Sequence, residues 1–164
     1  MATTIPEASV AISQLKSALS EVLSEIKGIS ELKKEQEYAL LEFLYGKDVL
    51  AVLPTGYGKS LIYQLAPLVT KKLSPTRNPL FIVISPLNAL MEDQIWEASM
   101  LGITAMKIGE HPDRDIMEGR CHLVFGSPEA WLLNDKWTTM LANDVYRENL
   151  MGIVVDEVHM TYQW

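Results

Sequence analysis

Apolar residues along this chain form two kinds of pattern: short continuous runs, and stripes that repeat every three or four residues. Four continuous runs predict strands: 49–52, 80–84, 122–125 and 151–155. The run at 80–84 is of the kind that is buried on both faces of a parallel sheet. A weaker strand is expected over 103–108. Strands that alternate with helical stripes indicate an α/β fold, with a mostly parallel central sheet and helices on both faces.

The striped segments predict helices over about 8–27, from Gln36 toward Gly46, and over about 61–72, 89–101 and 130–141. The stretch 111–119 is polar and predicts a loop with a short helical turn. The first helix carries a single apolar stripe and ends at Gly28. Packing of this stripe onto the domain is favoured over a short coiled coil, which fewer than three heptads would support only weakly. We therefore divide the chain into an N-terminal amphipathic helix, 1–28, and one domain, 29–164.

Composition limits the class of protein. The chain has 164 residues, of which 48% are hydrophobic, which is enough for the core of one domain. Its longest apolar runs are too short to span a membrane, and the N-terminus lacks the pattern of a signal peptide, so we expect a soluble intracellular protein with no membrane partner. The single cysteine, Cys121, excludes an internal disulfide. A net charge of −7 argues against a grip on nucleic acid through overall charge, so any such contact must be local.

The sequence Pro-Thr-Gly-Tyr-Gly-Lys-Ser at 54–60 follows the first apolar run and precedes a predicted helix. Strand, glycine turn and helix start are the context that a phosphate-binding loop requires. Gly56 and Gly58 allow the backbone N–H groups to approach an anion, and the helix N-terminus adds partial positive charge. Lys59 would reach the β- and γ-phosphates of a nucleotide, and the Ser60 hydroxyl would bind Mg²⁺. The alternative, a glycine turn with a surface lysine, is less consistent with the flanking elements.

A glutamine upstream of such a loop is a candidate reader of adenine. The amide of Gln36 offers both a donor and an acceptor, which matches the N6 amine and N7 of the base. Glutamines at such positions are more often solvated helix residues, and it is the position relative to Lys59 that favours a role in nucleotide binding.

The last apolar run ends in two acids, Asp156 and Glu157. Asp156 would hold Mg²⁺ through its water shell, and Glu157 would orient and deprotonate the attacking water. Adjacent acids are usually just solvated, but a position directly after a buried strand favours the catalytic reading. His159 is either a satisfied polar residue at a helix start or a link from the nucleotide site to a partner domain.

Polar clusters follow four of the predicted strands, at 55–60, 85–86, 127–129 and 156–157. In parallel sheets, ligands bind beyond the carboxyl ends of the strands. We therefore expect these clusters to form one site.

The motifs resemble the first RecA-like domain of RecQ-family DNA helicases over almost the whole chain. The resemblance rests on Leu-Lys-x-x-Gln at 32–36, Gly-Lys-Asp at 46–48, Lys-Ser-Leu-Ile-Tyr-Gln at 59–64, Ser-Pro-Leu-x-x-Leu-Met-x-Asp-Gln at 85–94, Ser-Pro-Glu at 127–129, Asp-Glu-Val-His at 156–159 and Gln-Trp at 163–164. Three departures from the family pattern are Lys33, in place of an arginine that helps to hold the nucleotide, Ile29, in place of an aromatic residue over the adenine, and Val158, a mild change from alanine.

The resemblance implies ATP and Mg²⁺ as cofactors and assigns roles to individual residues. Nucleotide binding falls to Lys33, Gln36, Pro54, Thr55, Gly56, Tyr57, Gly58, Lys59 and Ser60. Catalysis falls to Lys59, Asp156, Glu157 and His159, with Ser60 and Asp156 as the metal ligands. Contacts to DNA fall to Ser85, Pro86, Leu87, Gln94, Ser127, Pro128, Glu129 and Trp164.

The implied function is that of the ATP-binding part of an ATP-dependent 3′-to-5′ DNA helicase, acting on single-stranded or forked DNA. Its location would be the nucleus in a eukaryote and the cytoplasm otherwise. The chain stops inside the family's coupling loop and lacks a second RecA-like domain, so we expect these 164 residues alone not to unwind DNA. Two alternatives stay open, an RNA helicase of the DEAD-box class and a non-catalytic module that binds ATP or nucleic acid.

Overall fold

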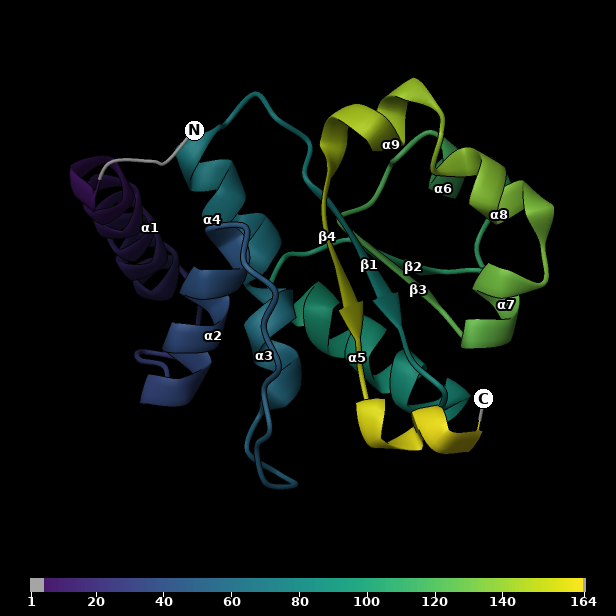
Figure 1. The fold of residues 1–164 in the computed structure, drawn as a ribbon, viewed down its shortest axis with the longest axis horizontal. Helices are drawn as coiled ribbons and strands as arrows, with labels where there is room; N and C mark the ends of the chain where they lie inside the picture. Colours follow the sequence, from purple (N-terminus) through teal and green to yellow (C-terminus); the bar gives the residue numbers. More distant parts are fainter. Residues whose placement is uncertain (1–4, 164) are drawn as a thin grey trace. The chain divides into compact units, whose positions relative to one another are not determined.

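The structure, a computed structural model, describes residues 5–163 and divides the chain into two compact units (Figure 1). The N-terminal unit comprises Met1–Thr76, and the C-terminal unit comprises Arg77–Trp164. The predicted boundary at residue 28 stays a prediction.

The N-terminal unit consists of four helices joined by loops. They are α1 (Ile5–Glu25), α2 (Lys34–Leu44), α3 (Lys59–Gln64) and α4 (Ala66–Leu73). The stripe of α1 is buried through Leu15, Ala18, Leu19 and Val22. Because α1 contacts both α4 and α2, its stripe serves to pack within this unit, and the preference for packing over a coiled coil is confirmed.

The strand expected over 49–52 does not form, and that prediction was wrong. Residues 47–54 have no regular secondary structure, and the side chains of Leu50 and Val52 are 76% and 83% exposed. A strand exists only when its backbone N–H and C=O groups are paired with a neighbouring strand. The strands that the structure describes all lie between residues 80 and 155, so the apolar run at 49–52 stays extended and unpaired.

The C-terminal unit is built on a four-stranded sheet with the order β2-β3-β1-β4. Its strands are β1 (Leu80–Ile84), β2 (Ala105–Lys107), β3 (Leu123–Gly126) and β4 (Leu150–Val155), and every pairing between them is parallel. The intervening helices are α5 (Asn88–Met100), α6 (Asp113–Met117), α7 (Pro128–Leu132), α8 (Asp135–Met140) and α9 (Asp144–Asn149), and a 3₁₀ helix, η1 (Val158–Gln163), follows β4. The predicted α/β architecture with a mostly parallel sheet is therefore confirmed.

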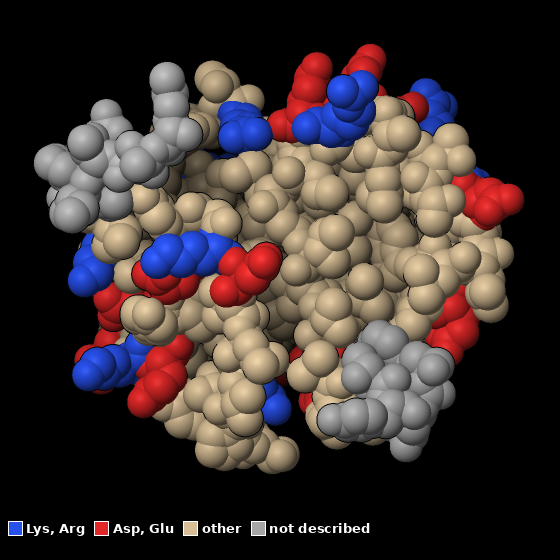
Figure 2. All heavy atoms as spheres, in the orientation of Figure 1, with Lys and Arg blue, Asp and Glu red and all other residues tan. Residues whose placement is uncertain are grey.

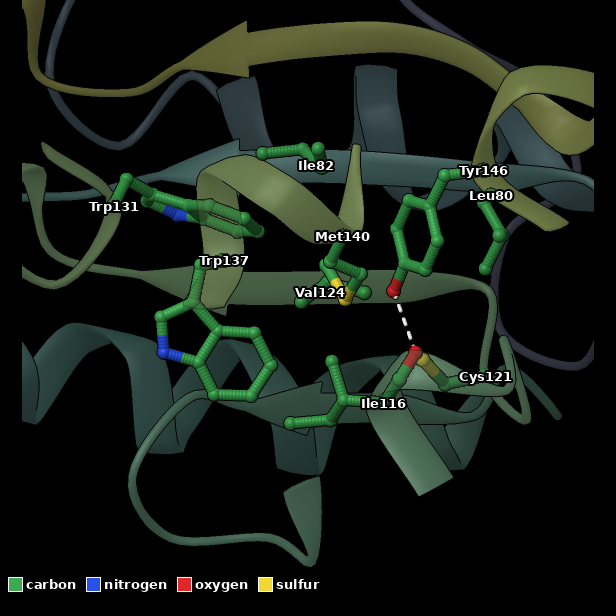
Figure 3. Close-up of a cluster of buried hydrophobic side chains, with 9 residues drawn as sticks. All are labelled: Leu80, Ile82, Ile116, Cys121, Val124, Trp131, Trp137, Met140 and Tyr146. Carbon is green, nitrogen blue, oxygen red and sulfur yellow. Dashed lines mark hydrogen bonds between the residues drawn. The ribbon is translucent and has the colours of Figure 1, made fainter. Parts of the chain in front are cut away.

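Aromatic side chains from the short helices fill the core on one face of this sheet (Figure 3). Trp131, Trp137 and Tyr146 come from α7, α8 and α9 in turn. They pack with Ile82 of β1 and Val124 of β3, which point to the same face because the two residues are paired in register. The neighbours of Ile82 and Val124 along each strand are also fully buried, so β1 and β3 are covered on both faces.

Two predicted helices are interrupted in the structure. The segment 61–72 divides into α3 and α4 because Pro67 lies in the first turn of α4, where a proline starts a helix but cannot continue one. The segment 130–141 divides into α7 and α8, where Asn134 caps the second helix by accepting a hydrogen bond from the N–H of Lys136 at 3.1 Å. Within residues 5–163, none of the helices is long and apolar enough to cross a membrane.

The hydroxyl of Tyr146 gives a test of the core. It donates a hydrogen bond of 2.7 Å to the backbone carbonyl of Ile116, and both residues are fully buried (Figure 3). We predict that Tyr146→Phe lowers the free energy of unfolding by about 1 kcal/mol, because the core loses a buried hydrogen bond. Urea denaturation of the chain measures this difference. Tyr38→Phe, at a side chain that is 68% exposed, is the matched control, and equal stability of the two variants would contradict the prediction.

Candidate functional site

The predicted phosphate loop forms a tight turn that leads into helix α3. Gly56 and Gly58 both have left-handed backbone conformations, with φ of 77° and 86°. The N–H of Tyr57 donates to the carbonyl of Pro54 at 3.2 Å and closes the turn. Gly58 is the N-cap of α3, so Lys59 and Ser60 occupy the first two helical positions. N–H groups at such positions have no acceptor within their own helix and are free to bind an anion.

Gln36 anchors this loop to helix α2. Its side-chain Nε2 donates to the carbonyl oxygens of Tyr57 at 3.1 Å and Gly58 at 2.9 Å. Its Oε1 accepts from the backbone N–H of Lys33 at 2.9 Å, which caps α2. The side chain is only 4% exposed, and a Cβ at Gly58 would lie 2.8 Å from its Nε2. Both N–H groups of the amide therefore donate to the loop itself. To contact adenine as predicted, the amide would have to give up at least one of these two hydrogen bonds.

Tyr57 forms a second attachment between the loop and α2. Its hydroxyl donates to the carboxylate of Glu35, which lowers the pKa of Glu35 and raises the pKa of Tyr57. The ammonium of Lys33 lies 4.1 Å from the centre of the Tyr57 ring and donates to the Tyr57 carbonyl at 3.2 Å. Lys33, Glu35 and Gln36 at the start of α2 thus all bind the same residue of the loop.

In the C-terminal unit, the carboxyl ends of three adjacent strands lie side by side. The N–H of Ser85, after β1, donates to the carbonyl of Gly126 at the end of β3 at 3.1 Å. The N–H of Asp156, after β4, donates to the carbonyl of Ile84 at 2.9 Å. The polar clusters predicted at 85–86, 127–129 and 156–157 therefore share one edge of the sheet. The fourth cluster, at 55–60, belongs to the N-terminal unit.

The two acids after β4 have different surroundings. The Oδ1 of Asp156 accepts the N–H of Glu157 at 2.9 Å, and its Oδ2 accepts the side-chain amide of Gln94 at 2.9 Å. Glu157 has φ of 51° and is the only non-glycine residue with positive φ in the described part of the chain. Its Oε2 lies 3.2 Å from Nδ1 of His159, which is exposed to solvent. The chain thus directs Asp156 toward α5 and Glu157 toward η1.

The residues predicted to contact DNA differ in how accessible they are. Leu87 and Glu129 are exposed, whereas the side chain of Ser85 is completely buried and Pro128 is buried in the first turn of α7. The hydroxyl of Ser127 caps α7 by accepting the N–H of Ala130 at 3.1 Å. Leu87 and Glu129 are thus the best placed for direct contact.

Three further residues were predicted to contact DNA. Pro86 and Gln94 are half-buried, and the amide of Gln94 contacts Asp156. Trp164 lies outside the described residues.

Two contacts in this site were not anticipated from the sequence. Glu35 is 22 residues from Tyr57, and Gln94 is 62 residues from Asp156. The sequence marked Tyr57, Gln94 and Asp156 as functional, but it contained no signal that paired them. Glu35 carried no signal at all, because acids are common in the first turn of any helix.

Charge and donor chemistry narrow what the site can bind. On the face drawn in Figure 2, Lys and Arg side chains are interspersed with Asp and Glu and do not form a continuous basic surface. Among residues 5–163, no group of three or more His, Cys, Asp or Glu side chains could hold a metal ion. A cation at Asp156 would therefore need further oxygen ligands, such as phosphate oxygens and water.

Comparison with known proteins gives consistent results. The family model for DEAD/DEAH box helicases matches residues 33–164. The chain is 31% identical over 157 residues to the ATP-dependent DNA helicase RecQ of Synechocystis sp., covering 91% of this chain and 31% of that protein. It is 29% identical over 156 residues to the ATP-dependent DNA helicase Q1 of Rattus norvegicus, covering 89% and 24% of the two chains. The resemblance to RecQ helicases is thus confirmed.

A solved structure has a similar fold. The crystal structure of the DUF1998 helicase MrfA bound to DNA and AMPPNP matches with a TM-score of 0.62 and 28% identity, covering 90% of this chain and 21% of that one. The chain spans less than a third of the length of each of these proteins.

The contacts of Gln36 predict the effect of its removal. We expect Gln36→Ala to weaken binding of ATP and GTP equally, by about 1 to 2 kcal/mol, because the loop loses two hydrogen bonds that attach it to α2 whichever base is bound. Calorimetric titration with both nucleotides measures this, and Glu37→Ala on the same helix is the control. A loss confined to ATP would show instead that Gln36 reads adenine.

Proposed function

The chain belongs to the DEAD/DEAH box helicase family, and we propose that it is the ATP-binding part of a RecQ-like, ATP-dependent 3′-to-5′ DNA helicase. The observation that carries this proposal is the turn with left-handed Gly56 and Gly58 that leads directly into α3 at Lys59. This geometry suits a nucleotide phosphate, because backbone N–H groups and a lysine converge at one helix start.

Nucleotide binding is assigned to the loop and to the start of α2. Lys59 binds the β- and γ-phosphates, and the N–H groups from Gly56 to Ser60 surround them. Lys33 and Gln36 hold Tyr57 and so set the shape of the loop. The remaining loop residues, Pro54 and Thr55, complete the turn.

The two residues assigned to the metal each suit Mg²⁺. Ser60, in the N-terminal unit, offers a hydroxyl, and Asp156, in the C-terminal unit, offers a carboxylate; both are hard oxygen ligands of the kind that Mg²⁺ takes together with phosphate oxygens and water. When bound with a nucleotide, Mg²⁺ would neutralise the charge on the transferred phosphoryl group. The protein's part is to orient the Asp156 carboxylate, to which Gln94 and the backbone N–H of Glu157 donate hydrogen bonds in this structure.

Glu157 is the proposed general base. Its carboxylate accepts a proton from the attacking water, and His159 lies close enough to orient this carboxylate. The side chain that reaches the water and the side chain that binds the metal must point in different directions. The contacts of Glu157 with His159 and of Asp156 with Gln94 support this division of roles.

DNA is the proposed polymer substrate. Leu87 and Glu129 are exposed near the carboxyl ends of β1 and β3, so a strand lying along this edge would touch both. Contact through such local elements agrees with a chain whose net charge is −7. A helicase acting on DNA implies an intracellular location. Competition between single-stranded DNA and RNA of the same sequence for this chain would distinguish the proposed function from that of an RNA helicase.

Lys59 gives the most direct test of the phosphate loop. We predict that Lys59→Ala abolishes calorimetric binding of Mg·ATP and leaves the circular dichroism spectrum unchanged, because this lysine is assigned to phosphate and not to the core. Lys16→Ala, at an exposed lysine of α1, is the matched control and should bind like the wild type. Unchanged affinity of Lys59→Ala would overturn the assignment.

The length of the relatives leads to a second prediction. In this class, hydrolysis takes place between two RecA-like domains, and an arginine finger from the second contributes roughly 10³ to 10⁵ in rate. We expect the 164 residues alone to bind nucleotide weakly, to hydrolyse ATP barely above background and not to unwind DNA. A version extended through a second RecA-like domain should hydrolyse ATP with stimulation by DNA. In that version, Glu157→Gln should bind ATP and turn it over poorly.

The measurement is phosphate release with and without single-stranded DNA. Turnover by the short chain at about 1 s⁻¹ or more, the scale of ordinary enzymes, would contradict the need for a second domain.

A further inference from the structure

Helix α5 contacts the metal-binding acid proposed above. The side-chain Nε2 of Gln94, in the middle of α5, donates to Oδ2 of Asp156 at 2.9 Å. The C-terminal unit contains both residues, and Figure 1 shows α5 running past the end of β4. Gln94 is half-buried, so this amide faces the sheet and not the solvent. This contact differs from the role in DNA binding expected of Gln94 from the sequence.

The second oxygen of the same carboxylate is also fixed. Oδ1 of Asp156 accepts the N–H of Glu157, so each oxygen has a hydrogen-bond donor. Two donors on different oxygens define the plane of a carboxylate, whereas one would allow it to rotate. The backbone donor is present whatever the side chains are, so Gln94 is the part of this arrangement that a substitution can remove.

We propose that Gln94 is a positioning residue, which orients the Asp156 carboxylate for Mg²⁺ and makes that orientation depend on the position of α5. Hydrogen bonds to a ligating carboxylate fix its geometry, and their loss typically costs roughly tenfold or more in metal affinity. A neutral amide suits this task, because a lysine or arginine in its place would compete with the metal for the same oxygen. The proposal rests on the proposed function in that Asp156 is taken as the metal ligand.

The start of α5 indicates that the hydrogen bond between Gln94 and Asp156 could transmit the binding of DNA to the metal site. The helix begins at Asn88, directly after the segment 85–87 that is expected to contact DNA, and Leu87 at its N-cap is 40% exposed. A strand bound at Leu87 would pull on the same rigid helix that carries Gln94. Movement of the helix would then reach Asp156 through a single hydrogen bond, which gives DNA a route to the metal site within one unit.

The test compares nucleotide affinity with and without metal. The dissociation constant of the ATP analogue AMPPNP is measured calorimetrically on the 164-residue chain, once in excess Mg²⁺ and once in EDTA. In Gln94→Ala, we expect the gain in affinity from Mg²⁺ to fall about tenfold, while the affinity in EDTA stays at the wild-type value. Asp93→Asn, at the exposed neighbouring position of α5, is the matched control and should keep the full gain.

Three results would overturn the proposal. The first is an unchanged gain from Mg²⁺ in Gln94→Ala. The second is loss of single-stranded DNA binding by Gln94→Ala in the absence of nucleotide, with the gain intact, which would make Gln94 a strand-contact residue. A fall in the unfolding midpoint together with a lower affinity in EDTA would show a purely structural role, and this also contradicts the proposal.

A measurement without nucleotide separates this inference from the proposed function. In the free chain, Asp156→Asn should shift the NMR signals of the Gln94 side-chain amide, because the variant loses the charged acceptor. Unshifted signals would show that the contact does not exist in solution. If the wild type bound no AMPPNP under either condition, the proposed function would fail, while the NMR result would still decide whether Gln94 holds Asp156.

Discussion

The parallel pairing of β1 with both β3 and β4 is the constraint on which the C-terminal unit depends. Parallel strands end at the same edge of a sheet, so the pairing itself brings Ser85, Ser127 and Asp156 together. Burial on both faces stabilises β1 and β3, because every side chain of β3 and four of five in β1 are buried. The apolar strands thus supply stability and place these polar residues at one edge of the sheet.

Two glutamines serve the same physical purpose in the two units. Gln36 donates from α2 to two carbonyls of the phosphate loop, and Gln94 donates from α5 to the carboxylate of Asp156. An amide fixes its partner without adding charge, so the loop keeps its attraction for anions and Asp156 keeps its attraction for cations. An amide also does not titrate, so neither glutamine gains or loses charge as the pH changes. In each unit, a side chain from a separate helix therefore positions the functional group: α2 holds the phosphate loop, and α5 holds Asp156.

The sequence was most informative where the structure is locally determined. The runs at 80–84, 122–125 and 151–155 form strands, and each is a mainly apolar run between turns. The run at 49–52 has the same character and is not a strand, because pairing depends on a neighbour that a local pattern cannot specify. The division of 61–72 could have been predicted from Pro67. The contact of Gln94 with Asp156 could not, since no local rule connects residues so far apart in sequence.

The left-handed conformation of Glu157 explains how two adjacent acids acquire separate roles. This conformation costs a non-glycine residue about 1 to 2 kcal/mol. The cost is offset locally, because the N–H of Glu157 donates to Oδ1 of Asp156, and a hydrogen bond to a charged group contributes about 1.5 to 3 kcal/mol. In an extended strand the two side chains would simply point to opposite faces of the sheet. The turn instead directs Asp156 at Gln94 on α5 and brings Glu157 to His159 on η1. The strained conformation of Glu157 thus separates the proposed metal ligand, Asp156, from the proposed base, Glu157.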